Sequence, residues 1–420
     1  MLTSIRLRAA TLLSGVVAVF LLPATAVLAQ TEMPASPSKH WGQVKFGSVY
    51  ITPSVALTHI GADTNVTNSS GVQTADFTFT IHPSVDTVFA GRKLYVKATP
   101  FVNAIYFHTF DRYRTLDPGV LLHVEFPIGK TRVFSDNSYI YSFTRPNFEI
   151  DERLRRRTAE VGLGVEYPLT PRVDLTVRGR VSRTDYDDAT YNGTNVSTTM
   201  DERREELRGV VGYDLSNFTS IFSTIWWVNG YFPNDRPRDS ITRSIGGGFR
   251  FNRRALLRGE VEAGYMQFDI PSGIAESYHG LYTRGTLGLT FKDRTTLDLF
   301  TTRMPTYSYS ETNVYYISNY YQGNVRRAIG SRFDLSMLFS YQGSSYTGGP
   351  KKNEITRIYE PSVGYSVGRG VRVGFYAAYW DRQSEFTANR DYNSWRFGIR
   401  ITTPFVTVNE TGGFVNGIQP

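Results

Sequence analysis

The sequence contains no cysteine among its 420 residues. This absence excludes disulfide bridges, thiolate metal sites and a cysteine nucleophile. The mean hydropathy is only −0.29, which excludes a polytopic helical membrane protein, because each of its spans needs about 20 apolar residues. The six histidines show no metal-ligand spacing and lie beside no Gly-x-Ser-x-Gly motif. We therefore expect no enzymatic activity, no metal site and no cofactor.

One apolar stretch stands near the beginning of the chain, from Leu12 to Leu22. The basic residues Arg6 and Arg8 precede it, and Val27-Leu28-Ala29 follows it, with a small residue directly before Gln30. This order predicts a cleavable secretory signal peptide over residues 1–29. An uncleaved anchor helix is the alternative, which the proline after the apolar stretch disfavours.

The rest of the chain is dominated by alternation of apolar and polar residues with a period of two. Clear examples are Val161–Tyr167, Val173–Val181, Phe333–Tyr341 and Trp395–Ile401. Successive side chains of a strand point to opposite faces, so each segment predicts a strand with one apolar face. No helix-like segment is present to cover these faces. The arrangement that satisfies them is a closed barrel with apolar faces toward lipid and polar faces toward a water-filled lumen.

The connections between the predicted strands are alternately short and long, which is typical of outer-membrane barrels. We expect an all-β, transmembrane, antiparallel up-and-down barrel over residues 48–405, after a flexible periplasmic segment (30–47) and before a C-terminal tail (406–420). Eighteen strands are predicted, near 49–60, 75–89, 92–107, 118–127, 131–145, 153–168, 171–185, 201–215, 217–231, 239–252, 254–269, 278–292, 294–307, 314–327, 331–343, 354–367, 369–381 and 392–405. The segments 131–145 and 217–231 alternate poorly, so sixteen strands is the alternative.

The face opposite the lipid predicts a charged lumen that is close to electrically balanced. The pore-lining candidates are Arg178, Arg180, Arg208, Arg258, Arg284, Glu166, Glu206, Glu260 and Glu262. We expect Arg178 and Arg180 beside Glu166 and Glu206, and Arg258 beside Glu260. These charges could form ion pairs that rigidify the wall, or an arginine ladder that selects ions at a constriction.

A constriction would have to come from a loop that folds inward, because too little chain precedes the first strand to form a plug domain. The longest candidates are residues 186–200 and 61–74, which are rich in Asn, Thr and Gly. The run Gly246–Gly248 follows no strand–helix pattern. It therefore predicts close packing or a bend in a strand rather than a phosphate-binding loop.

The formal net charge of +8 falls to +6 when the signal peptide is removed. The surplus basic residues stand beside the short turns, and Arg253, Arg254, Arg326 and Arg327 represent this periplasmic rim. Basic residues at that level meet lipid phosphates. We therefore expect membrane lipids rather than nucleic acid as their partner.

The sequence also resembles a family of putative β-barrel porins that is often found with exopolysaccharide synthesis and export genes in Gram-negative bacteria. The matching pieces are Tyr50-Ile-Thr-Pro-Ser-Val, Gly61-Ala-Asp-Thr-Asn, Ala75-Asp-Phe, His82-Pro-Ser-Val, Tyr106, Arg156-Arg157-Thr, Tyr167-Pro-Leu-Thr-Pro-Arg-Val-Asp-Leu175 and Tyr186. The resemblance implies a location in the outer membrane and a role in polysaccharide translocation. It implies no catalytic residue.

Three functions follow from these observations as alternatives. The first is a channel that assists export of an exopolysaccharide, the second a general diffusion porin for small hydrophilic solutes, and the third a structural or adhesive barrel with binding loops. The expected partners are outer-membrane lipids and lipopolysaccharide, the barrel assembly machinery and, for the first function, the polysaccharide and periplasmic export components.

Overall fold

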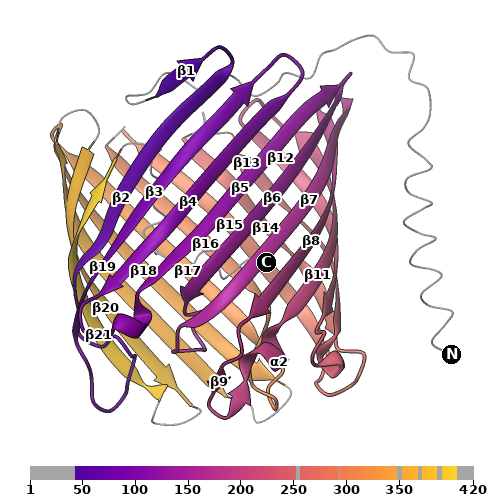
Figure 1. Ribbon diagram of the computed structural model, residues 1–420. Helices are drawn as coiled ribbons and strands as arrows, with labels where there is room; N and C mark the ends of the chain where they lie inside the picture. Colours follow the sequence, from indigo (N-terminus) through magenta and orange to yellow (C-terminus); the bar gives the residue numbers. More distant parts are fainter. Residues whose placement is uncertain are drawn as a thin grey trace.

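The computed structural model describes residues 43–251, 256–292, 294–347, 352–367, 371–385 and 390–403. Eighteen long antiparallel strands form one closed barrel (Figure 1). They are β2 (Val49–Asp63), β3 (Asp76–Ala90), β4 (Tyr95–Phe107), β5 (Thr115–Ile128), β6 (Thr131–Thr144), β7 (Leu154–Thr170), β8 (Val173–Tyr186), β11 (Glu202–Asp214), β12 (Thr219–Tyr231), β13 (Ser240–Phe251), β14 (Leu257–Asp269), β15 (Tyr278–Phe291), β16 (Thr295–Tyr307), β17 (Tyr315–Ile329), β18 (Phe333–Thr347), β19 (Asn353–Val367), β20 (Val371–Ser384) and β21 (Tyr392–Thr402).

The first and last long strands close the barrel, since β2 pairs antiparallel with β21 from Ala56 opposite Thr402 to Asp63 opposite Arg396. The expectation of eighteen strands is confirmed, and the sixteen-strand alternative is wrong. The two doubtful segments are β6 and β12, and each is paired with a neighbour on both sides. The alternation in β12 is weak because its inner face is also apolar there, where Trp226 packs in a buried cluster.

Short turns lie at one end of the barrel and long loops at the other. A small strand, β1 (Val44–Phe46), pairs with the start of β2 at the short-turn end. The long loops carry η1 (Asp111–Tyr113), β9 (Thr190–Tyr191), β10 (Thr194–Asn195), α2 (Val196–Met200) and η2 (Arg236–Arg238), and Figure 1 shows α2 and β9 at the end opposite β1. Among the described residues, no helix is long and apolar enough to span a membrane. The expected signal peptide (1–29) and C-terminal tail (406–420) lie outside the described residues.

Burial along the strands follows the predicted period of two. In β7, Val161 and Leu163 are more than half exposed, whereas Glu160 and Gly162, which alternate with them, are buried. Apolar side chains therefore point away from the barrel axis, toward the lipid that a transmembrane barrel meets. The polar side chains between them point inward, where the functional site must lie.

The Gly246–Gly248 run lies in β13, where the wall is tightly packed. A Cβ atom added to Gly248 would come within 1.8 Å of the Val261 carbonyl oxygen. We expect Gly248→Ala to destabilise the barrel by about 2 kcal/mol, because the backbone of β14 must move. The measurement is the temperature at which the folded barrel unfolds, read by its mobility in gel electrophoresis. Gly323→Ala is the control, since its Cβ would make only an ordinary contact of 3.5 Å with Leu299; equal losses in the two variants would contradict the prediction.

Candidate functional site

One group of lumenal charges is centred on Glu262, whose side chain is 1% exposed. Its Oε2 atom accepts hydrogen bonds from Arg208 Nη2 at 2.5 Å and from Arg284 Nε at 3.1 Å. The Tyr282 hydroxyl donates to the other oxygen at 2.7 Å. Arg208 lies on β11 and Glu262 on β14, with two strands between them. Side chains so far apart meet only on the concave inner side of the wall, so these residues face the lumen.

A second group is centred on Arg180 of β8. Its Nη2 atom lies 2.5 Å from Glu206 Oε2 on β11, and its Nη1 atom lies 3.4 Å from Glu160 Oε2 on β7. The expected neighbourhood of Arg180 and Glu206 thus agrees with the structure. Opposite charges on adjacent strands stabilise the wall between them.

Three arginines reach carboxylates two strands away by passing over a glycine on the strand between. The sets are Arg178–Gly162–Asp136, Arg258–Gly288–Asp298 and Arg372–Gly364–Asp334, with arginine-to-carboxylate distances of 3.2, 3.1 and 2.7 Å. A Cβ atom added to Gly288 would come within 2.5 Å of Arg258 Nε. The missing side chain therefore makes room for the guanidinium to cross.

Two expected pairings are wrong because Arg178 and Arg258 reach carboxylates two strands away, Asp136 and Asp298. Glu260 lies 2.9 Å from Arg250 on β13 and does not pair with Arg258. Glu166 contacts Arg132 on β6 rather than an arginine of β8. The nine pore-lining candidates are therefore all in contact with opposite charges, but they form several separate groups instead of one ladder.

The four rim candidates are described only in part. Arg253 and Arg254 lie outside the described residues. Arg326 Nη2 lies 3.0 Å from Asp334 Oδ2, at the short-turn end of β17. Arg327, on the other face of the same strand, is exposed.

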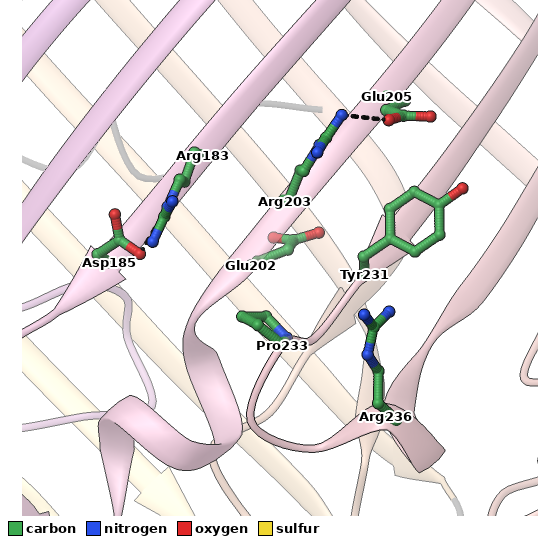
Figure 2. A pocket seen from close by; sticks show the side chains of 8 residues that line it. All are labelled: Arg183, Asp185, Glu202, Arg203, Glu205, Tyr231, Pro233 and Arg236. Carbon is green, nitrogen blue, oxygen red and sulfur yellow. Dashed lines mark hydrogen bonds and ion pairs between the residues drawn. The ribbon is translucent and has the colours of Figure 1, made fainter.

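Charged pairs also surround a pocket of about 480 Å³ near the long-loop end (Figure 2). Arg183 Nε lies 2.9 Å from Asp185 Oδ1, and Arg203 Nη2 lies 2.8 Å from Glu205 Oε1. Both arginines are more than half exposed, and they alternate with the inward-facing residues of β8 and β11. Exposed pairs of this kind contribute about 0–1 kcal/mol to stability, which makes them suitable controls for the lumenal pairs.

Residues 145–153, between β6 and β7, fold into the lumen and are called the crossing segment here. The ring centroid of Phe148 lies 6.0 Å from that of Tyr320 on β17, and β17 is nine strands from β6 in either direction around the barrel. Phe148 also packs against the buried cluster that contains Leu338 and Trp380. The segment therefore reaches from one wall of the barrel to the opposite wall.

The course of the crossing segment is fixed by a local turn and by its own apolar side chains. Asn147 Oδ1 accepts hydrogen bonds from the backbone N–H groups of Glu149 at 2.9 Å and Ile150 at 3.0 Å, which is a turn that asparagine favours. Ile150 is fully buried in a cluster with Tyr191 and Val196. These two residues come from the β8–β11 loop, one of the two segments expected to constrict the lumen.

The other expected segment, 61–74, also supports the crossing segment. The Val66 carbonyl accepts a hydrogen bond from Arg145 Nη2 at 2.6 Å, and Asn68 Nδ2 donates to Asp151 Oδ1 at 3.1 Å. Both expected loops therefore contribute contacts. Loop length did not identify the residues that cross the lumen, because the crossing segment is shorter than either expected loop. The apolar Phe148 and Ile150 within a charged loop were the available signal.

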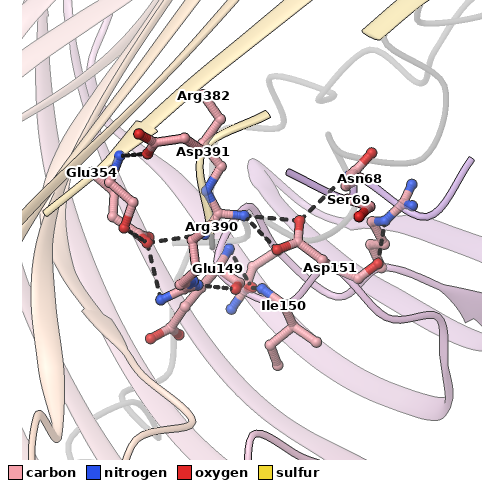
Figure 3. Close-up of polar contacts among 12 residues, drawn as sticks. Asn68, Ser69, Glu149, Ile150, Asp151, Glu354, Arg382, Arg390 and Asp391 are labelled. Atoms are coloured by element: carbon pink, nitrogen blue, oxygen red, sulfur yellow. Dashed lines mark hydrogen bonds and ion pairs between the residues drawn. The ribbon is translucent and has the colours of Figure 1, made fainter. Parts of the chain in front are cut away.

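Four charged residues attach the crossing segment to β19 and β20, and we call this group the latch (Figure 3). Arg382 Nη1 lies 2.8 Å from both carboxylate oxygens of Asp151, and Arg382 Nη2 lies 3.0 Å from Glu354 Oε1. Arg390 Nη1 also lies 3.0 Å from Glu354 Oε1. The Arg382 side chain is 0% exposed. The latch therefore attaches the crossing segment to β19 and β20 through buried, directional contacts.

Most of the barrel sequence matches a known family. The model of the family described as "Putative beta-barrel porin 2" matches residues 140–405. The chain belongs to this family. The family and the fold point to an outer-membrane channel rather than an enzyme.

Two solved structures are similar to the porin. OccAB2 from Acinetobacter baumannii has 12% sequence identity and a TM-score of 0.47, with 85% of this chain and 97% of that chain covered. A BenF-like porin from Pseudomonas fluorescens Pf-5 has 10% identity and a TM-score of 0.45, with coverage of 85% and 98%. No curated protein sequence matches the porin.

Glu149 of the porin's crossing segment gives the latch region a pH dependence. Burial raises the pKa of Glu149 from 4.5 to about 7, although the Ser308 hydroxyl and the Arg390 guanidinium act to lower it. The buried carboxyl group of Glu149 thus holds its proton more tightly than a glutamate carboxyl group does in water. We therefore expect the packed position of this segment to be most stable below pH 4.5 and to become less stable as the pH rises to about 7.

We therefore expect open events in single-channel recordings to be more frequent at pH 8 than at pH 4.5. Replacing Glu149 by Gln should remove most of this difference, because the amide does not titrate. A pH dependence that persists unchanged in Glu149→Gln would contradict the assignment to this group.

Proposed function

We propose that this porin is a gated, selective channel for hydrophilic solutes, with the crossing segment as its constriction. The observation that carries the proposal is the contact of this segment with opposite walls, through Phe148 and the latch. An eighteen-strand barrel without such a segment is wide enough for an aqueous channel. The crossing segment narrows the lumen at the level of the long loops, where a gate would control entry.

Liposome swelling tests selectivity directly. We expect sugars of equal size to enter proteoliposomes at different rates, because a narrowed and charged passage distinguishes their shapes. Uptake that depends on size alone would instead identify a general diffusion porin. Absence of any conductance in planar bilayers would identify a structural or adhesive barrel.

We further propose that the lumenal arginines set the ion preference of the channel, as rings of charge do in other pores. Alanine replacement of Arg178, Arg180, Arg208 and Arg258 is expected to shift the reversal potential in a salt gradient toward cation preference. The carboxylates that these arginines contact would then keep their negative charge with less positive charge beside them; they are Asp136, Glu160, Glu206, Glu262 and Asp298. An unchanged reversal potential would assign the arginines a purely structural role in the wall.

Our finer proposal for the transported solute is an exported polysaccharide. The resemblance of the chain to barrels found with exopolysaccharide genes supports it, as do the aromatic residues of the inner face, because the apolar faces of sugar rings pack on aromatic rings. Deletion of the gene should reduce the polysaccharide at the cell surface, and restoring the gene should return it. A normal amount of surface polysaccharide in the deletion strain would contradict this role and leave the channel proposal intact.

A further inference from the structure

The pocket of about 480 Å³ near the long-loop end lies on the outer face of the barrel (Figure 2). Three arginines from three elements line it: Arg183 of β8, Arg203 of β11 and Arg236 of η2. All three side chains are more than half exposed. The volume falls within the roughly 300–1,000 Å³ of ordinary ligand sites. The pocket is therefore large enough for a sugar headgroup and open to the surroundings of the barrel.

Two of these arginines face each other across neighbouring strands. Arg183 and Arg203 are directly opposite in the antiparallel register of β8 and β11, and like charges at such positions destabilise a sheet. Each guanidinium turns to a carboxylate two residues away on its own strand, Asp185 or Glu205 (Figure 2). Exposed contacts of this kind contribute about 0–1 kcal/mol. An anion that contacts both arginines at once can therefore displace the two carboxylates.

The three guanidinium groups keep most of their hydrogen-bond donors available. One nitrogen of each contacts a carboxylate: Nε of Arg183, Nη2 of Arg203 and Nη1 of Arg236, whose partner is Asp239. No other hydrogen bond joins these three side chains to the residues that the structure describes. The planar fork of N–H donors in arginine matches the oxygens of a phosphate group. The pocket thus offers phosphate-binding donors from three separate parts of the chain.

The position of the pocket along the wall is the level of lipid headgroups. Exposed apolar side chains lie on the same outer face nearer the middle of the barrel: Val181, Leu207 and Trp227. Tyr231 lines the pocket itself, and tyrosine and tryptophan are enriched where a membrane meets water. The long loops of an outer-membrane barrel face the cell exterior. The headgroups at this level therefore belong to the outer leaflet.

We propose that this pocket binds a phosphate group of lipid A, the phosphorylated glucosamine glycolipid of the outer leaflet. The phosphate oxygens accept hydrogen bonds from Arg183 and Arg203 in place of their carboxylates, and Arg236 donates from the β12–β13 loop. The acyl chains then run along the exposed apolar side chains below the pocket. This inference concerns the lipid around the barrel and does not depend on the solute that the channel carries.

Thermal unfolding of the full-length porin, refolded in detergent without cellular lipid, tests the inference. We expect lipid A to raise the unfolding temperature by several degrees and dephosphorylated lipid A to raise it much less. The double variant Arg183→Gln/Arg203→Gln should need at least about tenfold more lipid A for the same shift, because each lost hydrogen bond to a charged group costs about 1.5–3 kcal/mol. Arg327→Gln is the matched control, since Arg327 is an exposed arginine at the short-turn end of β17, and it should respond to lipid A as the parent does.

Three results would overturn the inference. Equal shifts with lipid A and dephosphorylated lipid A would exclude recognition of the phosphate. Equal responses of the double variant and the parent would exclude these arginines. Equal shifts with inorganic phosphate or phosphatidylglycerol at the same concentration would show a site for phosphate in general and exclude the preference for lipid A. Mobility in gel electrophoresis without heating shows that each variant forms a barrel before the comparison is made.

Discussion

Planar bilayers that contain the Asp151→Asn variant are expected to show a single-channel conductance several-fold above that of the parent porin. The substitution removes the negative charge of the Asp151 carboxylate, whose two oxygens each lie 2.8 Å from Arg382 Nη1. Arg382 stays buried with Glu354 as its remaining acidic partner in the latch. Removing one partner of a buried ion pair costs about 3 kcal/mol or more, which shifts the ratio of inserted to released segment roughly a hundredfold.

The control for this experiment is the same substitution at an exposed aspartate of the adjoining loop. Asp187 lies 3.2 Å from Arg157, and both side chains are about half exposed, so Asp187→Asn should leave the conductance unchanged. Heat-dependent gel mobility shows whether each variant forms a barrel. If the Asp151→Asn barrel is intact and conducts like the parent, the latch does not control the gating of this channel.

Glu262→Gln is expected to have the largest effect among the lumenal charges, on both stability and ion preference. The substitution leaves Arg208 and Arg284 with a neutral group in place of their shared, buried carboxylate. We expect the free energy of unfolding to fall by about 3 kcal/mol. The ion preference should shift toward anions, because the lumen gains one unit of positive charge.

Thermal unfolding on gels and reversal potentials in a salt gradient measure these two effects. Glu205→Gln is the matched control, because the Glu205–Arg203 pair is of similar length, 2.8 Å, but its glutamate is 36% exposed where Glu262 is 1% exposed (Figure 2). It should change neither quantity by a measurable amount. Equal changes in the two variants would show that burial and lumenal position do not determine the effect of Glu262 on stability and ion preference.

The strands of this barrel could be predicted from the sequence because alternate residues face lipid and water, and therefore alternate between apolar and polar side chains. The alternation from Val161 to Tyr167 lies within β7, and the expected strand at 92–107 differs from β4 only in its first residues. Alternation also places residues on the correct face, which is why Arg180 and Glu206 were expected together. Where the inner face is apolar, as at Trp226, the signal weakens although the strand persists.

The partners of the lumenal charges and the crossing segment could not be predicted in the same way. The contact of Arg258 with Asp298 depends on the register of three strands and on a glycine at one position of the middle strand. The alternation of apolar and polar residues along one strand does not specify its register against the neighbouring strands. The latch joins residues separated by more than 200 positions, such as Asp151 and Arg382, and no local pattern relates them.

This separation has a consequence for the biogenesis of the barrel. Arg382 belongs to the penultimate strand, so the latch cannot form until nearly the whole chain has been inserted, and contacts between distant residues form late in folding. A partly assembled intermediate would hold an unattached crossing segment and a lumen without its restriction. The finished protein would become restricted only when its C-terminal strands join the sheet, so that completion of assembly and closure of the pore are the same event.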